Sequence, residues 1–346
     1  METAERRTIV DLASAAGVSV STVDRVLNGR HPVRQVTADR VLEAAERIGF
    51  RGLTAIRHRV ANSRPVGRLG FLLQRPGQKE YRLWGEHLAE ATRASTIIHG
   101  RPVVRFVEDL TPDNVVDHLM ALSREVDAVA LVAADHPRIN HAVDMLAADG
   151  VQVFTLVTDL SAAGVVGHIG IDDLKKGRTA GWFVKGLARR AGPVAVIVGN
   201  ARYMSQDLAE TGFRGYLREH APDVRLLQTA PTLEDDAQAF SITEALLRDE
   251  PDLAGIYVAG GGIGGVIAAL RARGGAEEGP VVVVNELTEE TREALTDGVI
   301  RVVLSHPAGQ MAKTAVEMMA LALVGQNQSG RRSGILPFET FTSENV

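Results

Sequence analysis

Residues 18–30 read VSVSTVDRVLNGR, and this stretch decides how the first part of the chain folds. Ser19 is a good N-cap, so we expect a helix that begins there and runs to about Leu27. Val23 and Val26 stand three positions apart and, with Leu27, form one apolar face. Polar side chains occupy the other faces: Ser21, Thr22 and Arg25. The stretch is therefore either an ordinary amphipathic helix or a helix whose polar face reads a partner.

Two further helices flank this stretch. Thr8 followed by Asp11 is a capping-box-like pair and predicts a short helix before it. Gly17 tolerates positive φ where the chain must turn. A third helix is expected from Thr37 as N-cap, with an apolar stripe of Val41, Leu42, Ala45 and Ile48. Three short helices with a tight turn after the first are typical of a helix-turn-helix; a plain three-helix bundle is the alternative.

The run from Thr8 to Phe50 carries a longer pattern, TIVDLASAAGVSVSTVDRVLNGRHPVRQVTADRVLEAAERIGF. It contains the elements D-L-A, G-V-S, T-V-D-R-V-L-N and T-x-x-R-V-x-x-A. In these it resembles the DNA-binding headpiece of the lac repressor family. The resemblance implies a helix-turn-helix domain over residues 1–50 in a transcriptional regulator, usually a repressor, that binds a pseudo-palindromic operator as a dimer or a dimer of dimers.

The same resemblance implies which residues meet DNA. Val20, Ser21 and Arg25 would face bases, Arg25 reaching the O6 and N7 edge of guanine and Val20 packing on a thymine methyl. Hydroxyl and amide side chains would bind phosphates. These are Thr8, Ser19, Thr22 and Asn28. Four further basic residues complete the expected DNA-binding set: Arg30, His31, Arg57 and Arg59.

Residues 51–65 would be the hinge, and RGLTAIRHRVANSR (51–64) contains four arginines. In the family this segment is a short helix that inserts a leucine into the minor groove. Here Arg59 stands at that position, with Val60 next to it. Arg59 could enter a narrow minor groove by electrostatic attraction, Val60 could act as a smaller wedge, or the segment could be a flexible linker in the absence of DNA.

Charge is distributed unevenly along the 346 residues. Residues 1–64 hold 11 arginines and 7 acidic residues, a net charge of +4, whereas the remainder carries −9. A basic head on an acidic body indicates that only the head meets a polyanion. The chain has no cysteine, no initial apolar segment typical of a signal peptide, and no apolar run of bilayer length. We therefore expect a cytoplasmic protein without a membrane role.

From Gly67 onward, short β-branched runs alternate with helical stretches. GRLGFLLQ, RPVVRFVE, VDAVALVAA and VQVFTLVTD come first, and VVGHIGIDD, GPVAVIVG, LAGIYVAG and PVVVVNE follow. Buried parallel strands separated by helices are typical of doubly wound α/β sheets, and there are enough strands for two of them. The expected fold class is therefore α/β, with a three-helix headpiece followed by a two-lobed body over residues 66–346.

This body resembles the type I periplasmic sugar-binding proteins, as in the lac repressor family. The resemblance implies dimerisation through the body and three chain crossings, near 161–166, 287–291 and 325–334. Lobe one would take about 66–162 and 290–325, and lobe two about 163–289 and 326–346. A small effector, a sugar, polyol or derivative, would bind between the lobes at strand ends. Carboxylates, amides and aromatic rings at those ends are the candidates: Gln74, Tyr81, Trp84, Asp135, His136, Asp159, Asn200, Arg202, Asn285 and Glu286.

One pattern favours a different class of protein. Gly260, Gly262 and Gly265 form G-x-G-x-x-G after a strand, and Glu286 ends the next strand, as in a dinucleotide site. An NAD-dependent enzyme is therefore the alternative. The motif lies late in the body instead of opening a dinucleotide domain, and there is neither a G-x-S-x-G elbow nor an H-E-x-x-H helix. We expect a regulator that is not an enzyme and has no cofactor or metal.

Overall fold

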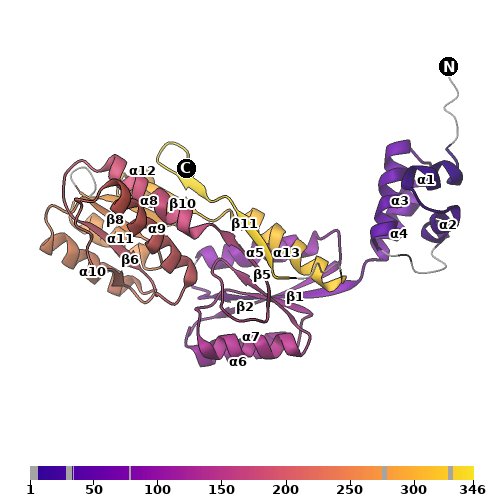
Figure 1. The fold of residues 1–346 in the computed structure, drawn as a ribbon, viewed down its shortest axis with the longest axis horizontal. Coiled ribbons are helices and arrows are strands. Elements are labelled where there is room, and N and C mark those ends of the chain that lie inside the picture. The colour runs from indigo at the N-terminus through magenta and orange to yellow at the C-terminus, as the bar shows by residue number, and fades with distance from the viewer. Residues whose placement is uncertain (1–6, 29–32, 34, 78, 275–278, 326–329) are drawn as a thin grey trace, which may run out of the picture. The chain divides into compact units, whose positions relative to one another are not determined.

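The structure is a computed structural model that describes residues 7–28, 33, 35–77, 79–274, 279–325 and 330–346. It contains two compact units (Figure 1). The helical unit comprises Met1–Gly67 with Ser95–Gly100, and the body comprises Arg68–Ala94 with Arg101–Val346. Within the described ranges, no helix is both long and apolar enough to cross a membrane.

The helical unit contains four helices in its described part. They are α1 (Ile9–Ala16), α2 (Val20–Asn28), α3 (Gln35–Ile48) and α4 (Leu53–Asn62). The capping box of Thr8 and Asp11 starts α1, and Gly17 ends it at φ 62°, as the sequence predicts. Thr37 is not an N-cap, because α3 already begins at Gln35. The turn between α1 and α2 therefore forms as a helix-turn-helix requires.

The fourth helix lies in the segment expected as the hinge, for which the resemblance implied a short helix and a flexible linker was the alternative. It packs into the core of the helical unit, so the flexible-linker alternative is wrong for this structure. Ile56 and Val60 of α4 are buried in one apolar cluster with Leu12, Val23 and Val41. A buried apolar face gives α4 the tertiary support that an isolated ten-residue helix lacks in water. Neither a plain three-helix bundle nor an unstructured linker describes this unit.

The first lobe of the body is a six-stranded sheet in the order β11-β5-β4-β3-β1-β2. Helices α6 (Pro112–Ser123) and α7 (Pro137–Ala148) pack on one face, and α5 (Lys79–Arg93) and α13 (Ala308–Leu323) lie together on the other (Figure 1). The strands are β1 (Val66–Gln74), β2 (His99–Val107), β3 (Ala128–Leu131), β4 (Gln152–Leu156), β5 (Val165–Ile171) and β11 (Arg332–Leu336). The pairs β1–β3, β3–β4, β4–β5 and β5–β11 are parallel, as expected for buried β-branched runs.

The second lobe is also a six-stranded sheet, in the order β12-β10-β9-β8-β6-β7. Its pairs are parallel except β10–β12, which is antiparallel. The strands are β6 (Val194–Val198), β7 (Ala230–Pro231), β8 (Gly255–Val258), β9 (Val281–Asn285), β10 (Val302–Ser305) and β12 (Glu339–Phe341). One apolar cluster joins the sheet to α8 (Asp173–Leu187) and α9 (Met204–His220). A second joins it to α10 (Asp236–Asp249), α11 (Ile263–Ala272) and α12 (Glu289–Thr296).

The chain crosses between the lobes later than the sequence suggested. Strand β5 pairs with β4 in the first sheet, so the first crossing follows Ile171 instead of lying near 161–166. Strand β10 pairs with β9 in the second sheet, so the next crossing lies between Ser305 and Ala308. The third lies between β11 and β12. Strand pairing is a long-range property, and the local pattern of a strand does not say which sheet it joins.

Candidate functional site

One side of α2 is buried and the other is exposed. Val23 and Val26 face the core of the helical unit, whereas Val20, Ser21 and Arg25 are exposed. The exposed fraction of Val20 is 46%, although it is an apolar residue. The helix therefore presents the apolar Val20 in its first turn and the basic Arg25 in its last turn on its exposed side, and helices of this motif meet base edges with such side chains.

Hydroxyl groups gather at the start of α2. The Ser19 hydroxyl accepts a hydrogen bond from the Thr22 N–H at 3.2 Å, as an N-cap does. It also lies 2.8 Å from the Ser21 Oγ and 2.8 Å from the Thr22 Oγ1. These three side chains thus form one small hydroxyl cluster at a helix N-terminus, an arrangement suited to a phosphate oxygen.

Other residues of the expected DNA-binding set have structural partners. Thr8 makes the capping box of α1, and the Asn28 Nδ2 donates to the Asp24 Oδ1 at 2.5 Å within α2. Arg57 bonds Glu46 at 2.7 Å, and Arg59 is exposed. Val60, by contrast, is 1% exposed and is not available as a wedge in this conformation. Two expected residues, Arg30 and His31, lie outside the described residues.

Two arginines of α3 hold α1 in place. The Arg40 Nη2 donates to the Ala16 carbonyl at 2.8 Å, and the Arg47 Nη2 donates to the Ala15 carbonyl at 2.6 Å. These bonds satisfy carbonyl groups at the C-terminal end of α1 and place positive charge at the negative end of its dipole. Part of the positive charge in this unit is therefore structural.

The body contains a cavity of about 460 Å³ between the strand ends of the second lobe and α5 of the first. Four of the expected effector residues line it: Tyr81, Trp84, Asn285 and Glu286. Three lining residues that are not glycine, Val157, Glu234 and Glu286, have φ between 61° and 65°. Such conformations are rare for side-chain-bearing residues and cluster at functional sites. The cavity is therefore the candidate effector site.

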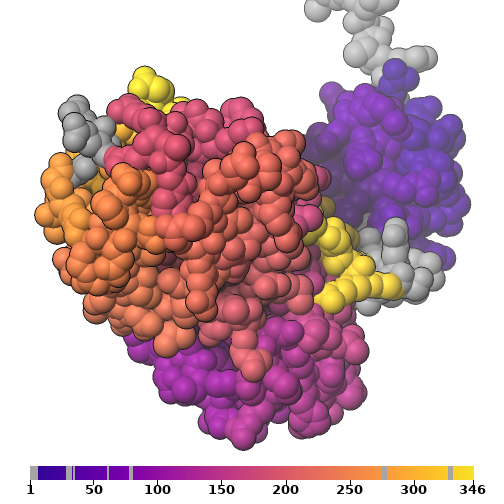
Figure 2. Space-filling model, turned by 60° about the vertical axis from the view of Figure 1, so that its left-hand side comes forward, coloured from indigo at the N-terminus to yellow at the C-terminus, as the bar shows by residue number. Residues whose placement is uncertain are grey.

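Direct contacts join the two lobes beside the cavity. The Gln74 Nε2 donates to the Tyr203 hydroxyl at 2.9 Å, and the Tyr81 hydroxyl lies 3.3 Å from the Gln74 Oε1. The Ser205 N–H donates to the Thr158 Oγ1 at 3.2 Å. In Figure 2 the orange second lobe lies directly against the magenta first lobe. Gln74 thus bridges the two lobes through its bond to Tyr203, and it does not line the cavity.

Four expected effector residues lie at another lobe contact. The Asp135 N–H donates to the Arg202 carbonyl at 2.8 Å, and Asn200 accepts from the Arg202 N–H at 2.9 Å. Burial opposes ionisation of Asp135, but hydrogen bonds from Asn140 and Ser161 hold the pKa of its carboxyl below the usual value. His136 caps α7. None of the four lines the cavity, so we assign them to loop structure.

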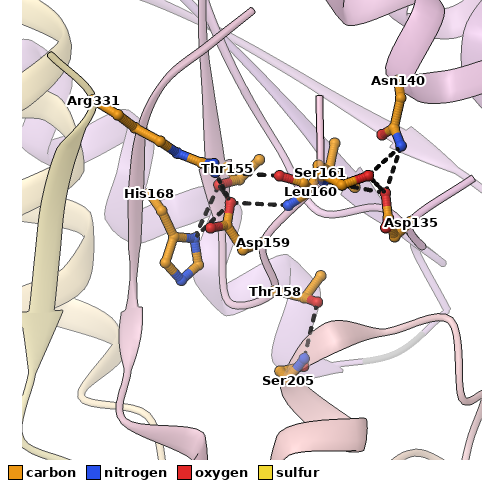
Figure 3. Close-up of polar contacts among 10 residues, drawn as sticks. All are labelled: Asp135, Asn140, Thr155, Thr158, Asp159, Leu160, Ser161, His168, Ser205 and Arg331. Atoms are coloured by element: carbon orange, nitrogen blue, oxygen red, sulfur yellow. Dashed lines mark hydrogen bonds and ion pairs between the residues drawn. The ribbon is translucent and has the colours of Figure 1, made fainter. Parts of the chain in front are cut away.

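Asp159 belongs to a polar cluster of the first lobe (Figure 3). It accepts hydrogen bonds from the Thr155 Oγ1 at 2.8 Å and the Leu160 N–H at 2.9 Å, and it pairs with Arg331. The His168 Nδ1 lies 3.7 Å away. These contacts tie β4 and β5 to the segment before β11. Asp159 therefore holds the lobe together and does not line the cavity.

Several cavity residues were not expected from the sequence. The charged, histidine and amide side chains among them are Lys176, Gln206, Glu234, Asp236, Glu289, Glu290, Glu293 and His306. His306 directly follows β10, just as Asn285 is the last residue of β9. The rule that binding residues lie at the carboxyl ends of parallel strands could therefore have identified His306. The others lie in helices or loops of ordinary composition and carry no local signal.

Lys176 and His306 each contact a carboxylate at the base of the cavity. The Lys176 Nζ lies 2.8 Å from the Asp173 Oδ1, and both side chains are buried. His306 bonds the Glu286 carboxylate through its Nδ1. Burial opposes ionisation of Glu286, but His306 and Lys176 outweigh it and hold the pKa of the carboxyl low. A charged and hydrogen-bonded network therefore lies beneath the cavity.

The glycine-rich turn after β8 contacts the chain's own carboxylates. A Cβ on Gly261 would lie 1.9 Å from the Glu234 Oε2, and one on Gly260 would lie 2.3 Å from the Gln206 Oε1. The Gly261 N–H donates to Glu234, and the Gly265 N–H donates to the Asp236 Oδ1 at 3.3 Å. The groups that would bind a pyrophosphate in a dinucleotide site are thus already used. These glycines permit close packing, and the dinucleotide interpretation of the motif is wrong.

The helical unit has a helix-turn-helix with an exposed face, and the body has two lobes with a cavity between them, the kind of place where small ligands bind. The chain belongs to the periplasmic binding protein domain family, whose model matches residues 114–327. Its N-terminal residues 8–52 match the model of bacterial regulatory proteins, lacI family. The two family models thus match the two parts of the chain, the helical unit and the body, and the glycine-rich turn lies inside the match to the body.

Two known proteins each match a portion of the chain. The maltose regulon regulatory protein MalI of Escherichia coli is 43% identical over 72 residues, 21% of this chain and 20% of MalI. The ribose import binding protein RbsB of Salmonella typhimurium is 24% identical over 193 residues, 56% of this chain and 64% of RbsB. The chain thus matches less than two thirds of either relative.

A solved structure matches the fold of the body. It is a solute binding protein from Agrobacterium vitis bound with α-D-tagatopyranose, with a TM-score of 0.73 and 19% identity. The match covers 81% of this chain and 96% of that chain. This likeness establishes the two-lobed fold.

Proposed function

We propose that the chain is a dimeric transcriptional repressor that binds a pseudo-palindromic operator through α2. The observation that supports this most directly is the division of α2 into a buried face with Val23 and Val26 and an exposed face with Val20, Ser21 and Arg25. In this proposal residues 1–50 bind DNA, residues 66–346 bind effector and dimerise, and the protein acts in the cytoplasm where the operator lies. A two-fold dimer places one α2 on each half-site.

A small, sugar-like effector in the cavity would control the affinity for DNA. Tyr81 and Trp84 supply aromatic surface from α5, and Asn285 and Glu286 supply polar groups from the end of β9. Because these residues come from different lobes, a ligand that touches both stabilises the closed arrangement. A ligand shifts DNA binding only through its different affinity for the two arrangements of the dimer.

The test of DNA recognition is the substitution Arg25→Ala in the full chain. Removal of a bidentate contact to guanine costs about 1–3 kcal/mol of base discrimination, so operator protection in a footprint should disappear at concentrations where the unchanged protein protects it. Arg124→Ala is the matched control, because Arg124 is an exposed arginine of the body. An unchanged operator footprint for Arg25→Ala would show that α2 does not read DNA.

The test of effector control is a thermal-shift screen of sugars and polyols, followed by operator binding in the presence of each hit. A ligand at 100 times its Kd adds about 2.7 kcal/mol to the stability of the state that it binds. A hit should also change operator affinity. If compounds stabilise the body and leave operator affinity unchanged, the cavity does not control DNA binding.

A further inference from the structure

The cavity of the body is lined by acidic side chains on the side of the second lobe. Six carboxylates line it: Glu234, Asp236, Glu286, Glu289, Glu290 and Glu293. Among the described lining residues, Lys176 is the only lysine or arginine, and its charge is paired with Asp173 at 2.8 Å. A ligand in this cavity therefore meets an excess of negative charge.

The carboxylates are close enough to affect one another. Burial, together with the charges of Asp236 and Glu293, raises the pKa of the Glu290 carboxyl above its usual value, although the charge of Arg271 opposes the shift. Burial also raises the pKa of Glu234, although Gln206 and the Gly261 N–H donate to it. Like charges brought together in this way are stabilised by a positive charge placed among them.

An unsatisfied buried atom in the same cavity indicates a polar ligand. His306 is 5% exposed and lines the cavity, and its Nδ1 bonds Glu286. Its Nε2 is buried without a hydrogen-bond partner among the described residues. A neutral ring would accept at Nε2 from a ligand N–H or O–H, and a protonated ring would donate to a ligand oxygen. Leaving such an atom unpaired costs free energy, so a ligand that pairs it gains affinity.

The first lobe contributes surface that suits a cation. Tyr81 and Trp84 of α5 line the cavity, and the Trp84 ring packs edge-on against His306, with 6.2 Å between the ring centroids. Aromatic faces attract ammonium groups, and the attraction increases when water is excluded. Negative charge from one lobe and aromatic surface from the other are thus both present.

An anionic ligand fits this cavity poorly. The backbone N–H groups of the glycine-rich turn would be its natural partners, but the Gly261 N–H donates to Glu234 and the Gly265 N–H to Asp236. A phosphate here would face carboxylates instead of donors. The described residues also contain no group of three or more His, Asp or Glu side chains that could hold a metal ion. The acidic lining therefore favours an organic cation.

We propose that the effector carries an ammonium group on a polar, hydroxyl-bearing skeleton, as an amino sugar does. The ammonium group lies among Asp236, Glu290 and Glu293, and a polar atom of the skeleton pairs with the His306 Nε2. This inference rests on the proposed function, because it names the chemical class of the effector that the cavity binds.

Matched pairs of ligands test the charge directly. Calorimetry on the full chain would compare D-glucosamine with D-glucose, D-galactosamine with D-galactose, and each amino sugar with its N-acetyl derivative. Putrescine and choline would test the ammonium group without a sugar skeleton. We expect at least one ammonium compound to bind tenfold or more tightly than its neutral counterpart, and added NaCl to reduce the difference.

A charge-removing variant tests the location. Glu290→Gln keeps the shape of the side chain and should reduce the affinity for the ammonium compound about tenfold, while affinity for the neutral counterpart stays unchanged. Glu244→Gln, on an exposed position of α10, is the matched control and should change neither affinity.

Two results would overturn the inference: no ammonium compound binds, or the neutral member of every pair binds as tightly as the charged one. These results differ from a failure of the proposed function. If a neutral sugar changes operator affinity and no ammonium compound does, the effector is neutral and the regulator remains. If α2 does not bind DNA in the footprint, the regulator itself is wrong, whatever the cavity binds.

Discussion

The exposed face of α2 and the cavity of the body are assembled in opposite ways. The face of α2 comes from consecutive turns of one nine-residue helix. The cavity takes residues from α5, α8, α9 and α12, from the loop before α10 and the turn after β8, and from the ends of β9 and β10. A surface built from one segment is readable in the sequence, whereas a surface built from many segments requires knowledge of the fold.

The largest effect is expected from a charge in the core of the helical unit. Val23→Asp places a carboxylate at a position with no solvent exposure, which costs several kcal/mol. The helical unit should unfold while the body keeps its thermal transition, as calorimetry and limited proteolysis would report. Ser21→Asp, on the exposed face of the same helix, should leave both transitions in place. Loss of both units in Val23→Asp would contradict their independent folding.

The base of the cavity should respond almost as strongly. Lys176→Met leaves Asp173 as an unpaired buried carboxylate, a change that typically costs about 3–5 kcal/mol. The body should therefore unfold at lower denaturant concentration, while the helical unit keeps its own transition. Lys175→Met is the matched control, because the Lys175 side chain is largely exposed and its pair with Asp172 contributes little. Equal losses of stability in the two variants would show that the buried Lys176–Asp173 pair contributes no more to stability than the exposed Lys175–Asp172 pair.

The glycine-rich turn offers a smaller and more local change. In Gly261→Ala the new Cβ would lie 1.9 Å from the Glu234 Oε2, so that carboxylate must move. We expect effector affinity to fall about tenfold, with less than about 1 kcal/mol change in stability, since the flexible side chain can shift. Gly186→Ala, where the Cβ meets nothing within 4 Å, should keep effector affinity and stabilise α8 by about 0.5–1 kcal/mol. If Gly261→Ala binds the effector with unchanged affinity, Glu234 does not contribute to effector binding.

The smallest effect concerns pH and the polar cluster around Asp159. Burial lowers the pKa of His168 in spite of Asp159 and Asp173 nearby. The unfolded chain therefore binds a proton at a pH where the folded chain does not. This contribution to stability is present above about pH 6.5 and is lost as pH falls below it, by at most about 1.4 kcal/mol per pH unit. His168→Gln should flatten this part of the stability curve, measured by denaturant titration between pH 5 and 8. If the free energy of unfolding of His168→Gln depends on pH as steeply as that of the unchanged protein, groups other than His168 cause this dependence.

Much of the fold followed from local pattern. The capping box at Thr8, the turn at Gly17 and the face of Val23 and Val26 predicted the helix-turn-helix, and the β-branched runs predicted two parallel sheets. Local pattern did not assign β5, β10 or β11 to the correct sheet, because it does not record pairing partners. For the same reason it left a flexible linker open as one alternative for residues 51–65, while Ile56 and Val60 are buried against helices earlier in the chain.

The sequence by itself determined the helix-turn-helix, the α/β class of the body and the exposed residues of α2, because each depends on neighbours within a few positions. Only the tertiary structure decided which strand ends meet at the cavity. Four of the expected effector residues line the cavity: Tyr81, Trp84, Asn285 and Glu286. Five others make contacts within loops or between the lobes instead: Asp135, His136, Asp159, Asn200 and Arg202. The tertiary structure also brought Lys176, Glu234 and His306 to the same place. The physical reason is that charge and burial at such a site arise from segments more than a hundred residues apart.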